Sequence, residues 1–155
     1  MKSLKINFNN KTSVQTIKLN SSKSESNRLL IIQALSDDKI EIENLSIAND
    51  TIILHNLIEK NPEESWNIED AGTSMRFLTS YLALTKEGSS VTGSERMKKR
   101  PIKILVNALR EIGSKISYLQ EDGYPPIKIN QKINQKINHI NIKGDISSQY
   151  ISSLL

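Results

Sequence analysis

A short apolar strand that leads through a Ser/Thr-rich turn into a helix is predicted three times in this chain of 155 residues. The strands begin at Ile17, Trp66 and Ile140. Their turns read Ser22-Lys23-Ser24-Glu25-Ser26-Asn27-Arg28, Ala71-Gly72-Thr73-Ser74-Met75-Arg76 and Ser147-Ser148-Gln149-Tyr150. Because the first N–H groups of a helix lack partners within it and carry the positive end of its dipole, three such starts side by side would attract an anion. The repeat therefore predicts a site for a small phosphorylated or carboxylated substrate.

The hydrophobic pattern between the turns changes repeatedly from a helical period to a strand period. Helices are expected from Ser24 or Ser26 to about Ser36, from Asn49 or Asp50 to Asn61, from Gly72 to Gly88 and from Pro101 to Gly113. Further strands are expected in a hairpin over residues 4–19 and at 40–45, 90–92 and 116–119. This order predicts an α/β fold, in the α+β sense, made of repeated strand and helix units.

Composition removes several classes of chemistry. The chain has no cysteine, which excludes disulfides, thiol nucleophiles and Cys-ligated metals, and only His55 and His139 could supply imidazole. No metal or other cofactor is therefore expected. The longest purely aliphatic run is Leu29-Leu30-Ile31-Ile32, which is too short to cross a membrane. These features together predict a soluble, cytoplasmic protein with no membrane partner.

The charge of the chain suits an anionic partner. A formal net charge of +4 fits either nucleic acid or anionic metabolites. The only compact basic run is Lys98-Lys99-Arg100, and aromatic residues, at 5%, are too sparse to stack bases. This favours small anions and predicts no nucleic-acid partner. A non-catalytic module that binds anions or nucleic acid stays open as an alternative.

Three segments could contact such an anion, and each also has a simpler explanation. Lys23 and Arg28 lie at a helix start, where the serines could be ordinary caps. Arg76, one turn into an apolar helix, is not explained by a simple turn at Gly72. The segment Arg96–Arg100 places basic side chains before a helix start, where cations oppose the helix dipole unless an anion compensates. The joint order of these segments is more specific than any one of them.

In this order and spacing the segments closely resemble the 5-enolpyruvylshikimate-3-phosphate synthase family, also called the 3-phosphoshikimate 1-carboxyvinyltransferases. The resemblance extends from about Ile17 to the final residue. It is carried by residues 19–28, 70–76, 92–101, 124–126 and 144–149. A related transferase family that acts on UDP-N-acetylglucosamine shares the fold and is the alternative among enzymes. The Ser-Lys-Ser-x-Ser-Asn-Arg pattern of residues 22–28 argues against it.

The resemblance implies the enolpyruvyl transferase fold, in which each of two domains contains three βαβαββ units and the active site lies between the domains. It implies a monomeric transferase that moves the enolpyruvyl group of phosphoenolpyruvate to the 5-hydroxyl of shikimate 3-phosphate and releases phosphate, in the pathway to chorismate and the aromatic amino acids. Residues 1–16 would be strands that normally pack with the distal domain. Residues 17–155 would be an incomplete first substrate-binding domain that ends inside a helix, and the chain alone is expected to be inactive because the family's acid/base residues lie downstream.

Residue roles follow from the same resemblance. Lys23 is implied as the catalytic residue that contacts both substrates. For shikimate 3-phosphate the implied binding residues are Lys23, Ser24, Arg28, Ser147, Ser148 and Gln149. For phosphoenolpyruvate they are Lys23, Gly72, Arg96 and Gln149, with Asp70 and Thr73 as further candidates. Asp70 replaces an Asn that is common in the family, and its carboxylate should repel a phosphate unless it faces a cation such as Arg96 or a backbone amide.

Overall fold

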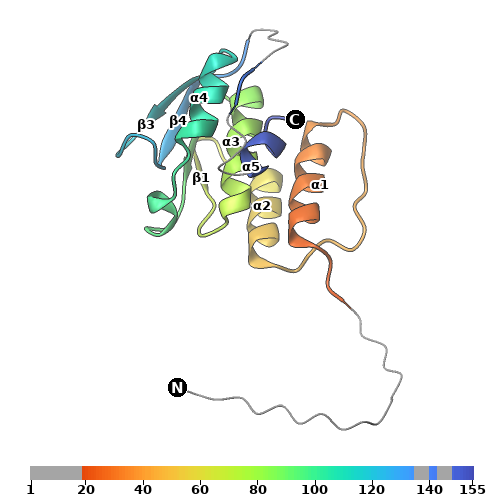
Figure 1. Cartoon of the computed structure of the whole chain (residues 1–155). Coiled ribbons are helices and arrows are strands. Elements are labelled where there is room, and N and C mark those ends of the chain that lie inside the picture. The colour runs from red at the N-terminus through yellow and green to blue at the C-terminus, as the bar shows by residue number, and fades with distance from the viewer. Residues whose placement is uncertain (1–18, 135–139, 143–147) are drawn as a thin grey trace, which may run out of the picture.

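The computed structural model describes residues 19–134, 140–142 and 148–155. In chain order the elements are α1 (Lys23–Leu35), α2 (Asn49–Lys60), β1 (Ser65–Asn67), α3 (Gly72–Thr85), β2 (Ser90–Thr92), the 3-10 helix η1 (Met97–Lys99), α4 (Lys103–Glu111), β3 (Lys115–Tyr118), β4 (Ile127–Gln131) and α5 (Ser148–Ser152). Figure 1 shows α1, α2 and α3 side by side and aligned, with the sheet beyond α3 and α4. The described part of the chain therefore has a helical layer packed beside a small sheet.

The sheet is mixed, with the strand order β1-β2-β4-β3. Strands β1 and β2 are parallel, so that Trp66 lies opposite Val91, and α3 makes the crossover between them. Strand β4 is antiparallel to both β2 and β3. A βαβ crossover followed by antiparallel strands confirms the predicted α/β class in its α+β sense.

Helix α3 forms the centre of the hydrophobic core. It packs against α1, α2, α4, α5 and the sheet. Met75, Leu78 and Leu82 on one face of it are at most 2% exposed, and Phe77 on the opposite face is 5% exposed. A helix that is apolar around most of its circumference must be enclosed, and each large side chain it buries contributes about 1.5–3 kcal/mol. The start of α3 is therefore held firmly relative to every other element that contacts it.

Most predicted elements are confirmed, because local capping signals define their ends. Helices α1 and α2 begin and end within about one residue of the expected positions. Helix α4 begins at Lys103, two residues after Pro101, and the chain leaves it through Gly113 with a φ of 102°. The strand expected at 90–92 is present as β2, and it pairs in parallel with β1.

Two predicted strands are wrong, and neither pairs with a strand in the described part of the chain. Residues 40–45 alternate in hydrophobicity, but the segment runs along the outside of α1, away from the sheet (Figure 1), and forms no ladder. Its Ile40 carbonyl instead accepts a hydrogen bond from the Gln33 side chain at 2.6 Å. Residues 140–142 are likewise not a strand. The predicted hairpin over residues 4–19 lies almost wholly outside the described residues.

Candidate functional site

The starts of α1, α2 and α3 lie together at one end of the helical layer, the lower end in Figure 1. Buried side chains join them. The side-chain NH2 of Asn27 in α1 donates to the Ser74 hydroxyl of α3 at 3.3 Å. The Thr51 hydroxyl of α2 donates to the side-chain oxygen Oδ1 of Asn27 at 2.8 Å. Ser74 in turn donates to the Asp50 backbone carbonyl at 3.3 Å. These side chains are fully buried, so their hydrogen bonds fix the three helix starts relative to one another.

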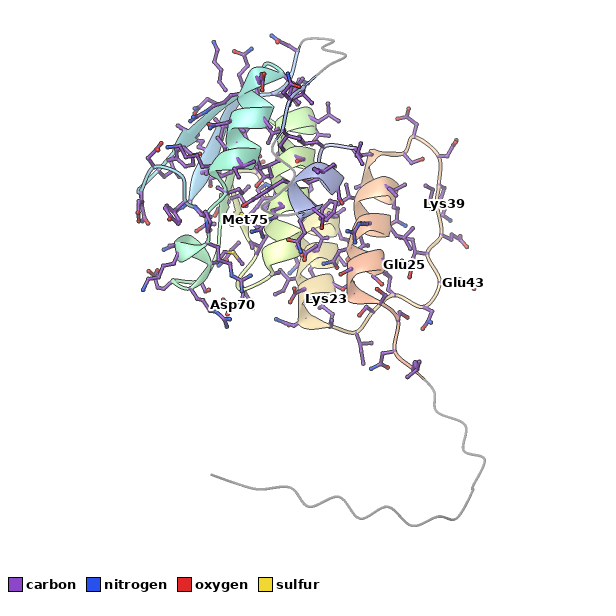
Figure 2. All side chains as sticks on the ribbon, in the orientation of Figure 1. Lys23, Glu25, Lys39, Glu43, Asp70 and Met75 are labelled. Atoms are coloured by element: carbon purple, nitrogen blue, oxygen red, sulfur yellow. The ribbon has the colours of Figure 1, made fainter. Side chains whose placement is uncertain are left out.

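Lys23 is anchored across the first two of these starts. Ser22 caps α1 by accepting the Glu25 N–H at 3.3 Å, which places Lys23 in the first turn. The Lys23 ammonium lies 3.1 Å from the Asp50 carboxylate at the start of α2, and both side chains keep part of their surface exposed. Figure 2 shows Lys23 and Asp70 at the same end of the molecule. Lys23 is therefore accessible to a ligand at this end.

Arg28 lies one turn further along α1 and turns toward α3. Its guanidinium donates to the Ser24 backbone carbonyl at 2.8 Å and lies 5.3 Å from the centre of the Phe77 ring. A guanidinium over an aromatic face is held in place without losing its charge. Ser24 itself is exposed, and its backbone carbonyl rather than its hydroxyl contacts Arg28.

Helix α3 starts without a side-chain cap. The residue before it is Ala71, which has no side-chain acceptor, so among the described residues no side chain accepts the N–H groups of Gly72, Thr73 and Ser74. Two guanidinium groups cover this start. Arg76 donates to the Gly72 carbonyl at 2.6 Å, and a Cβ added at Gly72 would overlap a terminal nitrogen of Arg100. Uncapped amides beneath two cations form a strongly positive spot.

None of these guanidinium groups is paired with a carboxylate. The ion pairs within the described residues all use lysines: Lys23–Asp50, Lys39–Glu41, Lys98–Glu95 and Lys103–Asp122. The Nε of Arg76 is buried and has no hydrogen-bond partner among the described residues. Positive charge that the protein does not neutralise is available to an anionic ligand.

Asp70 has a different partner from either of those considered from the sequence. Its carboxylate accepts the Ser94 hydroxyl at 2.6 Å, and the Ser94 oxygen accepts the Met97 N–H at 3.2 Å. Asp70 therefore joins the turn before α3 to the loop before η1. Arg96, in that loop, is exposed, and its side chain makes no hydrogen bond or ion pair with a described residue. In the same loop, a hydrogen bond from Lys98 lowers the pKa of the Glu95 carboxyl.

Helix α5 brings the third predicted turn to the same place. The Gln149 side-chain amide donates to the Thr73 hydroxyl at 3.2 Å. The Tyr150 hydroxyl donates to the Pro101 carbonyl at 2.8 Å, and the Tyr150 ring lies 5.1 Å from the Arg76 guanidinium. Ser148 opens the helix and is exposed, while Ser147 lies outside the described residues.

The structure thus links four of the residues predicted from the sequence and adds others. Lys23, Gly72, Thr73 and Gln149 are connected directly or through shared partners. The structure adds five residues to which the sequence assigned no specific role: Asp50, Ser74, Arg76, Arg100 and Tyr150. Arg76 could be recognised from the sequence as a candidate, because it is an arginine one turn into an apolar helix. The position of Arg100 over Gly72 depends on tertiary packing and could not.

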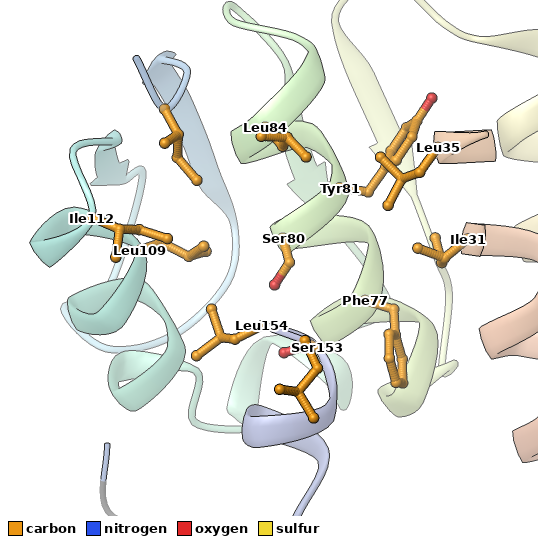
Figure 3. A pocket seen from close by; sticks show the side chains of 12 residues that line it. Ile31, Leu35, Phe77, Ser80, Tyr81, Leu84, Leu109, Ile112, Ser153 and Leu154 are labelled. Atoms are coloured by element: carbon orange, nitrogen blue, oxygen red, sulfur yellow. The ribbon is translucent and has the colours of Figure 1, made fainter. Parts of the chain in front are cut away.

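A cavity of about 250 Å³ lies elsewhere, between α1, α3, α4 and α5 (Figure 3). Its lining is mainly apolar, with Phe77, Leu84, Leu109 and Leu154 among the side chains that point into it. No charged side chain lines this cavity, so it offers nothing to hold a phosphate. We therefore place the candidate anion site at the helix starts and not in this cavity.

Other kinds of site were sought in the same residues. Within 19–134, 140–142 and 148–155, no three His, Asp or Glu side chains are grouped so as to hold a metal ion. In those ranges no helix has the length and hydropathy needed to cross a bilayer.

The fold and the helix starts define an α/β protein with unpaired guanidinium groups gathered at the start of one helix. Comparison with known proteins makes this specific. The family profile described as EPSP synthase (3-phosphoshikimate 1-carboxyvinyltransferase) matches residues 53–155, and the chain belongs to this family.

Relatives and solved structures agree with this assignment. The chain is 50% identical over 141 residues to the 3-phosphoshikimate 1-carboxyvinyltransferase of Bacteroides fragilis strain YCH46, covering 90% of the chain and 34% of that relative. It is 38% identical to the enzyme of the same name from Sulfurovum sp. strain NBC37-1, covering 90% and 38%. The 2.37 Å structure of EPSP synthase from Acinetobacter baumannii superposes with a TM-score of 0.75 at 21% identity, covering 90% and 36%, which confirms the expected fold. The chain spans about a third of the length of these relatives.

Proposed function

We propose that this chain supplies one face of the active site of a 3-phosphoshikimate 1-carboxyvinyltransferase. That enzyme transfers the enolpyruvyl group of phosphoenolpyruvate to the 5-hydroxyl of shikimate 3-phosphate and releases phosphate. The observation that carries the proposal is the junction of three Ser/Thr-rich turns around the uncapped start of α3. Both substrates are polyanions, and such a junction offers amide N–H groups and unpaired cations to them.

The proposed roles follow the positions of the side chains. Lys23 contacts both substrates from the start of α1, and its ammonium stabilises negative charge as the tetrahedral adduct forms. Ser24 and Arg28 hold the shikimate carboxylate region. Ser147, Ser148 and Gln149 bind the 3-phosphate, and Gln149 also lies between the two ligands. These groups act by position and charge, because they are held before the substrates arrive.

Phosphoenolpyruvate is proposed to lie against the start of α3. Gly72 permits close approach of the backbone, Thr73 lies beside it, and Arg96 contacts the phosphate. Asp70 does not contact the ligand itself, because its carboxylate accepts a hydrogen bond from Ser94. It holds the loop that carries Arg96 and does not face the phosphate.

The remaining parts of the proposal concern the whole protein. We propose a monomeric, cytoplasmic enzyme that uses no cofactor and binds no nucleic acid. We also propose that residues 1–16 pack with a distal domain and residues 17–155 belong to the first substrate-binding domain. The chain alone is proposed to bind substrate without turning it over.

Calorimetric titration of the 155-residue chain tests this proposal. Shikimate 3-phosphate should bind saturably and more tightly than shikimate, because the phosphate adds charge-assisted hydrogen bonds. UDP-N-acetylglucosamine should not bind, and a DNA duplex should show no binding beyond a generic, strongly salt-dependent level. Tighter binding of UDP-N-acetylglucosamine, or binding of shikimate as tight as that of its phosphate, would contradict the proposal. Phosphate release above background with both substrates would contradict the predicted inactivity of the chain.

A further inference from the structure

We propose that Arg100 contacts the anion bound at the start of α3 and that Tyr150 is its positioning residue. The inference deepens the proposed function and rests on it. The sequence places Arg100 in the basic segment Arg96–Arg100 but assigns a specific role there only to Arg96, and it assigns none to Tyr150.

The first observation is the place of the Arg100 guanidinium. It lies over Gly72 in the space that any side chain there would fill, with the Arg76 Nη1 3.5 Å from the same point. The Arg100 side chain makes no hydrogen bond or ion pair with a described residue. A cation held against an uncapped helix start is repelled by the helix dipole. An anion bound between Arg100 and the start of α3 would be attracted to both of them and would remove this repulsion. A planar guanidinium suits a phosphate or a carboxylate.

The neighbours of Arg100 do not share this position. Lys98 forms an ion pair with Glu95 at 2.7 Å, and Lys99 is exposed. Arg96 is also exposed, whereas Arg100 is half-buried. Of the basic side chains in this segment, Arg100 is therefore the one that the fold directs to the start of α3.

The second observation is how the backbone next to Arg100 is held. Tyr150 is 2% exposed, and its hydroxyl donates to the carbonyl of Pro101, the residue that follows Arg100. The Arg100 N–H donates to the Met97 carbonyl at 2.9 Å, so the chain is fixed on both sides of the arginine. The Tyr150 ring also supports Arg76, the second guanidinium at this start. Tyr150 thus positions both cations from the helix that carries Gln149.

Anion affinities of a small set of variants test the inference in the full 155-residue chain. Arg100→Gln should weaken phosphoenolpyruvate binding about tenfold or more, as expected for one lost charge-assisted hydrogen bond. Arg100→Lys should retain part of the affinity, because it keeps the charge and loses the planar fork. Lys99→Gln is the matched control, since it removes the same charge from an exposed neighbour, and it should change the affinity by no more than about twofold.

The role of Tyr150 is tested by a double-mutant cycle. Tyr150→Phe should weaken phosphoenolpyruvate binding about threefold in the wild-type background and have no further effect with Arg100→Gln, because it acts through Arg100. A residue that only stabilises the fold would weaken binding equally in both backgrounds. Tyr118→Phe is the control, because the Tyr118 hydroxyl is buried without a hydrogen-bond partner among the described residues and it should leave binding unchanged.

The outcomes separate this inference from the proposed function. Equal losses from Arg100→Gln and Lys99→Gln would overturn the role of Arg100, and additive losses in the cycle would overturn that of Tyr150. In either case, tight binding of shikimate 3-phosphate would leave the proposed function intact. Inorganic phosphate binding that depends on Arg100, with no preference for shikimate 3-phosphate, would support the inference and contradict the proposed function. Absence of binding by all three anions would overturn both.

Discussion

Gln149 donates its side-chain amide to the hydroxyl of Thr73, which lies 76 residues earlier in the chain, at 3.2 Å. This bond joins the third Ser/Thr-rich turn to the second, and the bond from Asn27 to Ser74 joins the first turn to the second. All three turns therefore meet at the start of α3. Their convergence follows from contacts between side chains and gives the candidate site its shape.

Asn27→Ala should lower the free energy of unfolding by about 2–3 kcal/mol, because it leaves the buried Thr51 hydroxyl without its acceptor and removes one of the two partners of the Ser74 hydroxyl. Urea denaturation measures this loss. The control is Asn56→Ala on the exposed face of α2, which should change the free energy by no more than about 0.5 kcal/mol. Equal effects of the two substitutions would show that the buried network does not hold the helix starts together.

Lys23→Gln should separate stability from binding. The ion pair with Asp50 is partly exposed, so its loss should cost at most about 1 kcal/mol of unfolding free energy. Binding of shikimate 3-phosphate should weaken about tenfold, because a cation that contacts the ligand is removed. Lys39→Gln breaks another exposed ion pair, with Glu41, and should leave binding unchanged. Calorimetric titration of both variants measures the two affinities. Unimpaired binding of shikimate 3-phosphate to Lys23→Gln would refute the proposed role of this lysine.

Gly72→Ala should displace the Arg100 side chain, whose terminal nitrogen occupies the space of the new methyl group. Because that end of the arginine is flexible, the unfolding free energy should change by less than about 1 kcal/mol. Affinity for phosphoenolpyruvate should fall several-fold, since the methyl group also blocks close approach to the backbone.

Gly88→Ala provides the opposite pattern. Its φ of +83° is unfavourable for alanine, although no atom lies within 4 Å of the added carbon, so it should cost about 1 kcal/mol of stability and leave affinity unchanged. If Gly72→Ala behaves in the same way as Gly88→Ala, the approach of a ligand to Gly72 is excluded.

Ionisation of Tyr118 should lower the free energy of unfolding at alkaline pH. Burial raises the pKa of its hydroxyl above the ordinary value of 10.0, and Asp122 adds to the rise while Arg110 opposes it. The folded state therefore binds this proton more tightly than the unfolded state does. The associated stability is complete below about pH 10 and is lost as pH rises through the folded-state pKa.

The pH dependence of urea denaturation measures this effect as the difference between the wild type and Tyr118→Phe. At neutral pH the substitution should be nearly neutral, because the hydroxyl has no partner among the described residues. Above about pH 10 the wild type should lose stability more steeply than the variant. Parallel curves for the two proteins would contradict the shift.

The sequence predicted what is set by neighbouring residues. Ser22 caps α1 and Gly113 ends α4, because caps and turns depend on local chemistry. Residues 40–45 have a strand's periodicity, but a ladder also needs a second strand, which the local pattern cannot show. Two contacts of the candidate site likewise join separate segments. They are the hydrogen bond from the Ser94 hydroxyl to Asp70 and the approach of the Arg100 guanidinium to Gly72. The positions of the turns were thus predictable, and their side-chain partners were not.

The most direct test of the account is to map where shikimate 3-phosphate and phosphoenolpyruvate bind when both are added, by following the backbone amide resonances of the isotope-labelled chain. The account predicts that the largest shifts fall on the starts of α1, α3 and α5, at Lys23, Gly72, Thr73 and Gln149. These residues should all reach saturation over the same range of ligand concentration. Shifts confined to a single helix start, or centred on the apolar cavity between α1, α3, α4 and α5, would contradict it.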